Sequence, residues 1–183
     1  LKIRDQSGGG GNEIDDVTMT TDQSLTLYAA VYDQDDNYIQ DLSVDWVSSG
    51  DLDEVSASGT SYNFSPSTAF TAGTIWISSG SLISDFTGTI TVNSGTPSYL
   101  IIRDQTGGGG NEIGDITMTT DETLDLWAAV YDADGNYLEV TGSAWTISGN
   151  LDSDDMFSGN MITFSPSSAP TNGRISATWG ETI

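Results

Sequence analysis

Residues 24–32 read SLTLYAAVY, and residues 123–131 read TLDLWAAVY. In the first stretch, every second residue is apolar: Leu25, Leu27, Ala29 and Val31. The second stretch has the same spacing, with Leu124, Leu126, Ala128 and Val130. A strand turns successive side chains to opposite faces, so this period indicates a β-strand with one buried face. Both stretches therefore predict half-buried strands of a β-sheet protein.

The two stretches belong to a duplication that covers most of the chain. RDQSGGGGNEI at 4–14 returns as RDQTGGGGNEI at 103–113, and Trp46 aligns with Trp145. After one inserted residue, FSPSTAFTAGTI at 64–75 aligns with FSPSSAPTNGRI at 164–175. The sequence therefore predicts two domains of one kind, 1–95 and 96–183, each large enough to bury its own core.

Short segments of period two, separated by turn residues, run through each copy, and we expect no helix. Further strands are expected around Tyr62, Ile75 and Ile90. About seven or eight short strands are typical of an antiparallel β-sandwich. Ile183 aligns with Ile83, and the second copy has no residues that align with TGTITV at 87–92. We therefore predict that the second domain lacks its last strand.

The charge is strongly one-sided, with 27 acidic and 4 basic residues and a formal net charge of −23. Such a surface repels phosphate backbones and anionic lipid heads, which argues against nucleic-acid binding and against binding at a membrane surface. The sequence has no long apolar run, so we predict no membrane insertion. Salt or divalent cations would relieve the repulsion between carboxylates, which favours an extracellular or cell-surface location.

The chain contains no histidine and no cysteine. The commonest general base, the commonest zinc ligand and thiolate chemistry are therefore missing. Carboxylate pairs are abundant, but no partner base can be assigned to them. We predict that the protein is not an enzyme, and no cofactor is indicated with certainty, with calcium as the one candidate.

The repeated glycine run admits two interpretations. A phosphate-binding loop is excluded because no helix pattern and no Lys-Ser or Lys-Thr pair follows it. Glycines suit a corner where the chain passes from one sheet to the other and needs positive φ angles. Alternatively, the corner brings oxygen ligands together around calcium, which takes about six to eight of them. The candidate calcium ligands are Asp5, Glu13, Asp15 and Asp16 in the first copy and Asp104, Glu112 and Asp115 in the second.

Other residues have simpler interpretations. DQDDN at 33–37 and DADGN at 132–136 lack the glutamate that closes an EF-hand loop, so we expect hairpin turns. Arg4 and Arg103 are expected to pair with a carboxylate and so to pin the glycine corner. A large ring suits a sandwich core, so Trp46 and Trp145 should be buried, whereas Tyr32 and Tyr131 are expected on outward faces or turns. Those two tyrosines, with other exposed rings, would pack between domains or subunits.

AAVYDADGNYLEV at 128–140, the strand with Trp145 and then FSPSSAPTNGRISATWG at 164–180 resemble bacterial immunoglobulin-like domains. Such domains occur in tandem in invasin-type and intimin-type adhesins. The resemblance covers both copies and implies two tandem immunoglobulin-like sandwiches in an extracellular stalk or spacer. The GGGGNE insertion is not a general feature of that family.

Two function classes follow from these observations. The first is a non-catalytic structural module of a stalk, surface layer or filament, whose partners are neighbouring repeats or further copies of itself. Such a module could polymerise if a neighbour added the missing strand. The alternative is a binding module, either a calcium-stiffened adhesin or a carbohydrate-binding domain.

Overall fold

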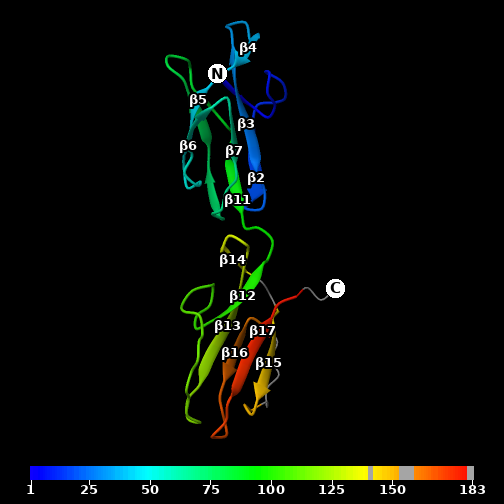
Figure 1. The fold of residues 1–183 in the computed structure, drawn as a ribbon, viewed down its shortest axis with the longest axis vertical. Coiled ribbons are helices and arrows are strands. Elements are labelled where there is room, and N and C mark those ends of the chain that lie inside the picture. The colour runs from blue at the N-terminus through cyan, green and yellow to red at the C-terminus, as the bar shows by residue number, and fades with distance from the viewer. Residues whose placement is uncertain (140–141, 153–158, 181–183) are drawn as a thin grey trace. The chain divides into compact units, whose positions relative to one another are not determined.

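The computed structural model describes residues 1–139, 142–152 and 159–180. These residues form 17 β-strands and no helix, which confirms the all-β prediction (Figure 1). The chain divides into two compact units, Leu1–Gly95 and Thr96–Ile183, called unit 1 and unit 2 below.

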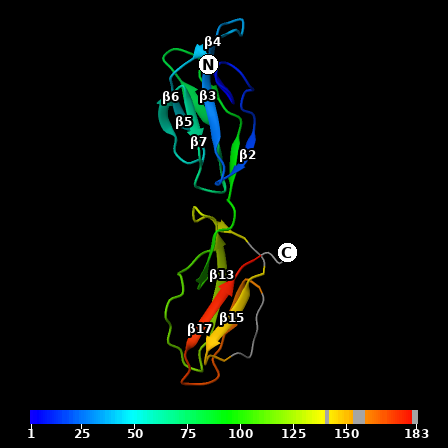
Figure 2. The ribbon, with the colours of Figure 1, turned by 45° about the vertical axis from the view of Figure 1, so that its right-hand side comes forward.

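Unit 1 contains three sheets, visible from two directions in Figures 1 and 2. The first has the order β1-β3-β4, with β7 also paired to β3; the second has the order β10-β9-β5-β6; and the third has the order β2-β11-β8. The strands are β1 (Lys2–Arg4), β2 (Val17–Thr20), β3 (Leu25–Tyr32), β4 (Tyr38–Asp41), β5 (Val44–Ser48), β6 (Ser56–Gly59), β7 (Ser61–Phe64), β8 (Thr71–Gly73), β9 (Ile75–Ser78), β10 (Asp85–Phe86) and β11 (Ile90–Asn93).

The strand predicted from residues 24–32 is β3, which pairs antiparallel with three neighbours. Leu27 and Ala29 are fully buried, as the alternation predicts. Ala30 and Val31 are also buried, so the end of the strand is covered on both faces. The alternating pattern therefore describes only the first part of β3.

One hydrophobic core joins all three sheets of unit 1, consistent with a β-sandwich. Trp46 on β5 is fully buried, and its indole N–H donates to the carbonyl of Gly59 at 3.0 Å. Trp145 in unit 2 is 3% exposed and donates to Gly159 at the same distance, 3.0 Å. The prediction that both tryptophans are core residues is confirmed. Their polar N–H groups are satisfied by carbonyl oxygens.

The third sheet departs from the antiparallel pattern. β11 lies between two partners, with β8 antiparallel on one side and β2 parallel on the other. In the parallel pair, Val17 is opposite Ile90 and Thr20 is opposite Asn93. Ile90 and Val92 are fully buried. The last strand of unit 1 is therefore part of the core as well as part of a sheet.

Unit 2 has fewer strands among its described residues. They form one sheet of order β12-β13-β14, with β16 paired to β13, and a second sheet of β15 and β17. The strands are β12 (Tyr99–Arg103), β13 (Leu124–Tyr131), β14 (Tyr137–Leu138), β15 (Ala144–Gly149), β16 (Met161–Phe164) and β17 (Gly173–Thr178). Residues 116–119, which align with β2, form no strand, and no described strand occupies the place of β11. Ile183, on which the predicted loss of a last strand depended, lies outside the described residues.

The burial of aligned residues differs accordingly. Met19 and Ile75 in unit 1 are 5% and 0% exposed, whereas their counterparts Met118 and Ile175 are only partly buried. Ile116, which aligns with Val17, is 49% exposed. The described part of unit 2 therefore buries its apolar residues less completely than unit 1 does.

We expect Ile75→Ala to destabilise unit 1 by about 2–5 kcal/mol, because it leaves a cavity in a closed core. Ile175→Ala should cost unit 2 less, because that side chain keeps contact with solvent. Chemical denaturation followed by residue-specific NMR signals separates the two units. Equal losses of unfolding free energy from Ile75→Ala and Ile175→Ala would contradict the difference in core closure.

Candidate functional site

The glycine corner, residues 4–14 and its copy at 103–113, is the most distinctive repeated feature. In unit 1, the N–H of Asp5 donates to the carbonyl of Asn12 at 3.1 Å, and Arg4 forms an isolated bridge with Glu13. In unit 2, the N–H of Asp104 donates to Asn111 at 3.1 Å, and the same kind of bridge recurs. Both loops are therefore closed by backbone bonds at their base.

Three of the four glycines have positive φ angles. Gly8, Gly9 and Gly11 have φ values of 70°, 69° and 68°, and their counterparts in unit 2 lie within the same narrow range. A Cβ on Gly11 would lie 1.7 Å from Oδ1 of Asp5, and a Cβ on Gly9 would lie 2.3 Å from the ring of Tyr38. Gly10 has neither constraint. The expected need for positive φ is confirmed at three positions of each loop.

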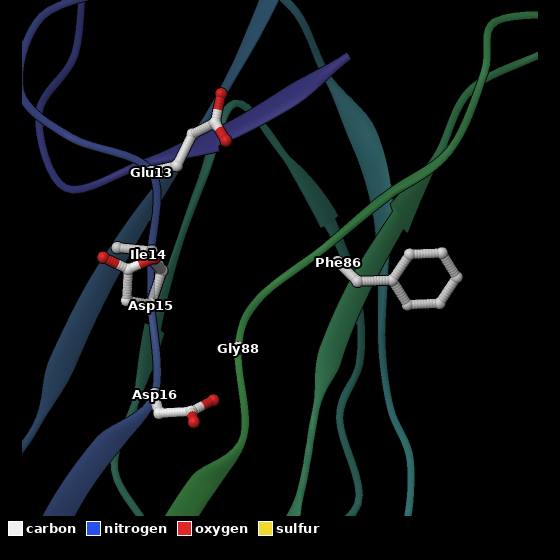
Figure 3. A pocket seen from close by; sticks show the side chains of 6 residues that line it. All are labelled: Glu13, Ile14, Asp15, Asp16, Phe86 and Gly88. Carbon is white, nitrogen blue, oxygen red and sulfur yellow. The ribbon is translucent and has the colours of Figure 1, made fainter.

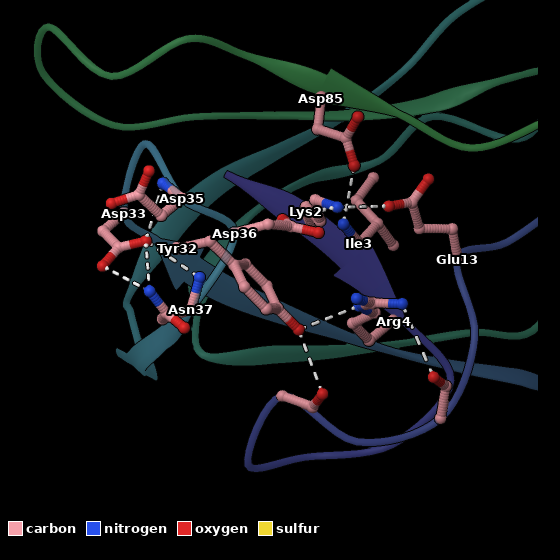
Figure 4. A network of polar contacts seen from close by, with 12 residues as sticks. Lys2, Ile3, Arg4, Glu13, Tyr32, Asp33, Asp35, Asp36, Asn37 and Asp85 are labelled. Atoms are coloured by element: carbon pink, nitrogen blue, oxygen red, sulfur yellow. Dashed lines mark hydrogen bonds and ion pairs between the residues drawn. The ribbon is translucent and has the colours of Figure 1, made fainter.

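Arg4 connects the glycine corner to β3. Its Nε donates to the hydroxyl of Tyr32 at 3.0 Å, and that hydroxyl donates to the carbonyl of Gly9 at 3.0 Å (Figure 4). The guanidinium also donates to the carbonyl of Gly11 at 3.5 Å and lies 5.2 Å from the centroid of the Tyr32 ring. A cation near an aromatic ring adds electrostatic attraction to these hydrogen bonds.

The same contacts recur in unit 2. Arg103 Nε donates to the hydroxyl of Tyr131 at 2.6 Å, and that hydroxyl donates to Gly108 at 3.0 Å. The expected pairing of each arginine with a carboxylate is wrong, because among the described residues the guanidinium groups bind a phenol and a carbonyl instead. Tyr131 is 6% exposed, so its expected outward position is also wrong.

The acidic side chains next to the corner have separate structural partners. Oδ1 of Asp5 accepts the N–H of Asn12 at 2.8 Å, and Oδ1 of Asp104 accepts the N–H of Asn111 at 2.7 Å. The bonds from Asn111 lower the pKa of Asp104. Each of these carboxylates therefore closes its own glycine loop.

The other candidate calcium ligands diverge. Glu13 pairs with Nζ of Lys2 at 3.0 Å, and Asp16 accepts the N–H of Thr89 at 2.7 Å. Glu13, Asp15 and Asp16 line one side of a surface depression, with Phe86 opposite, and Asp15 and Asp16 point to different sides of the chain (Figure 3).

In unit 2, the bridge between Glu112 and Arg103 is formed by the backbone. Asp115 has no hydrogen bond or ion pair within the described part of the chain. No group of three or more acidic side chains suited to a metal ion occurs in the described residues. Calcium binding stays a prediction that no arrangement of these side chains supports.

The acidic stretches at 33–37 and 132–136 form the expected turns. Oδ1 of Asp33 accepts the N–H groups of Asp35 and Asn37 at 3.0 and 2.8 Å, and Asp132 does the same for its own turn. The bonds from Asn37 lower the pKa of Asp33. Lys2 reaches Asp36 at 2.9 Å, which links this turn to β1.

One repeated contact, between an aspartate and the Ser-Pro turn, has a signal in the sequence that no expectation above includes. Oδ2 of Asp53 accepts the N–H of Ser67 at 2.6 Å and its hydroxyl at 3.1 Å. Asp152 accepts the corresponding N–H groups of Ser167 and Ser168 in unit 2. The signal is the joint repetition of Leu-Asp at 52–53 and 151–152 with Phe-Ser-Pro-Ser at 64–67 and 164–167. Each aspartate therefore fastens the Ser-Pro turn of its unit.

Comparisons with protein-family models, with curated proteins and with solved structures found no significant match. The described residues contain no helix that is long and apolar enough to cross a membrane.

We expect Gly11→Ala to destabilise unit 1 by more than about 1 kcal/mol, because the new Cβ meets Asp5 and the backbone has a positive φ. Gly10→Ala is the matched control in the same loop and should change stability by less than about 0.5 kcal/mol. Thermal unfolding of both variants measures the difference. Similar effects would mean that the loop does not need glycine at a defined position.

The hydrogen bonds from Ser168 and Ser167 lower the pKa of Asp152 from 3.8 to about 2. A carboxyl group with a lowered pKa stabilises the folded state above its unfolded pKa, and this contribution disappears as the pH falls through the folded pKa. We therefore expect Asp152→Asn to reduce stability at neutral pH and to weaken the loss of stability between about pH 4 and pH 2. Unfolding temperatures across this range check the prediction, and parallel curves for the variant and the parent would refute it.

Proposed function

We propose that the chain is a non-catalytic, load-bearing repeat module of an extracellular stalk, surface layer or filament, built from tandem immunoglobulin-like domains. The observation that carries the proposal is the parallel pairing of β2 with β11 in unit 1. β2 follows the glycine corner near the start of the unit, and β11 is the last strand of the unit.

Parallel pairing determines how this ladder responds to tension. A pull on the two ends of unit 1 draws β2 towards its own start and β11 towards its own end. In a parallel pair these directions are opposite, so the strands are loaded lengthwise and their hydrogen bonds share the force. The bonds from the N–H of Val17 to Thr89, at 2.9 Å, and from Thr21 to Asn93, at 3.1 Å, lie at the two ends of this ladder.

The contacts before β2 also suit a module under load. Force applied at the N-terminus reaches β2 through β1 and the glycine corner. The bonds between Arg4, Tyr32 and Gly9 tie that corner to β3. These hydrogen bonds would therefore have to break before the full force reaches the ladder of β2 and β11.

Several internal contacts of unit 1 recur in unit 2, which supports a structural role. The glycine corner, the Asp33 and Asp132 turns and the bonds to the Ser-Pro turn have the same partners in each copy. A stalk needs interchangeable repeats, whereas a receptor-binding tip needs loops of its own. The net charge of −23 suits a saline exterior, where ions screen the repulsion between carboxylates.

Single-molecule pulling of the 183-residue chain tests the proposal. We expect unit 1 to unfold at a clearly higher force than unit 2, because only unit 1 has the parallel ladder among the described residues. Val17→Pro removes the N–H that binds Thr89 and should lower the unfolding force of unit 1.

Ile116→Pro is the matched control, since Ile116 aligns with Val17 but has no ladder partner within described unit 2. It should leave the unfolding force of unit 2 nearly unchanged. An unfolding force of unit 1 that is as low as that of unit 2, and that Val17→Pro does not change, would argue against a load-bearing role.

A further inference from the structure

Unit 1 shows in detail how this repeat holds its last strand. The N–H of Gly88 donates to the carbonyl of Ile14 at 2.7 Å, and the N–H of Thr89 donates to Asp16 at 2.7 Å. The strand then pairs with β2 in parallel and with β8 in the antiparallel sense. Both Ile90 and Val92 are fully buried.

Unit 2 contains the aligned partners of these bonds. Ile113 stands where Ile14 stands, and Asp115 where Asp16 stands. Residues 114–118 form no hydrogen bond with any other described residue. Backbone N–H and C=O groups that lack such partners can pair with a further strand.

Unit 2 also contains a counterpart of β8, the antiparallel neighbour of β11 in unit 1. Residues 171–173 align with β8. The N–H of Asn150 donates to the carbonyl of Asn172 at 2.9 Å, which reproduces the bond from Asp51 to Ala72 at 3.0 Å in unit 1. One bond is lost, because Phe70, whose N–H donates to Val92, is replaced by Pro170.

The apolar side chains at the aligned positions of unit 2 are less buried than their counterparts in unit 1. Ile116 is 49% exposed, and Met118, Ile175 and Ala177 are only partly buried. Their counterparts Met19, Ile75 and Ile77 share a closed core with Ile90 and Val92. Two apolar side chains at alternate positions of a strand in the place of β11 would therefore bury more of these apolar residues in unit 2.

We propose that unit 2 is an acceptor for a β-strand with the chemistry of β11, which enters parallel to residues 116–119 and antiparallel to residues 171–173. The occupant is an extended segment of the form Gly-Thr-Ile-Thr-Val, the sequence at 88–92. Glycine begins it because a Cβ on Gly88 would lie 2.4 Å from the backbone of Asp15 and Asp16. The β11 of unit 1 is itself buried at Ile90 and Val92, so the occupant is a second segment with the same chemistry. A load-bearing role for unit 1 does not require this acceptor, so the two proposals can fail separately.

A synthetic peptide with the sequence of residues 84–93, SDFTGTITVN, is the first probe. Calorimetric titration into the 183-residue chain should show saturable binding. Amide hydrogen exchange should slow by at least about tenfold at Ile116 and Thr120, the counterparts of the donors Val17 and Thr21, and stay unchanged in unit 1. A peptide with I90T and V92T keeps the strand propensity but loses the apolar contacts, and should bind at least about tenfold more weakly.

The second probe joins residues 84–93 directly after Ile183. This fusion should protect the same amides without added peptide and should no longer bind the peptide. Its I90T and V92T version is the matched control and should leave the amides unprotected. Protection in the fusion supports the acceptor even if the free peptide binds too weakly to detect.

Three results would overturn the proposal. One is a fusion whose amides at 116–120 exchange as fast as those of the I90T and V92T control. Another is equal binding of both peptides. The third is self-association of the 183-residue chain through residues 116–119 that an excess of the peptide SDFTGTITVN does not reduce. In that case the occupant would be residues 116–119 of a second copy.

Discussion

The chain of hydrogen bonds from Arg4 through Tyr32 to Gly9 determines how the polypeptide leaves its first strand. β1 belongs to the sheet of β3, whereas β2 belongs to the sheet of β11. The loop between them has to turn through three positive-φ residues, which are costly to order. A cation, a phenol and two carbonyl oxygens hold that turn against β3. Once the turn is fixed, β2 can lie parallel to β11, and the core closes.

The few cations of the chain are concentrated at this place. Of the four basic residues, Lys2, Arg4 and Arg103 lie in the first strand of a unit. Lys2 joins Glu13 to Asp36, and the arginines bind tyrosines and glycine carbonyls. Most carboxylates are therefore left to solvent and to local N–H donors, as in the Asp33 and Asp132 turns. Such bonds hold turns together without reducing the net charge.

The sequence predicted the features that depend on local pattern. Alternation identified β3 and β13, the duplication related the two copies, and ring size placed Trp46 and Trp145 in the core. It could not predict the partner of Arg4, because a tyrosine 28 residues away offers no charge signal in so acidic a chain. The parallel direction of β2 was missed for a similar reason, since strand direction depends on the route through the glycine corner. The candidate calcium ligands show that nearness in sequence need not bring side chains together, because no group of three or more acidic side chains suited to a metal ion occurs in the described residues.

The central claim is that the arginine–tyrosine contact stabilises the glycine corner in both units. A double-mutant cycle with Arg4→Lys and Tyr32→Phe measures it most directly, because Lys keeps the charge but lacks the Nε–H donor. We predict a coupling energy of about 1–2 kcal/mol in unit 1, and a similar value for Arg103→Lys with Tyr131→Phe in unit 2. Additive effects in both cycles, with coupling near zero, would contradict the claim.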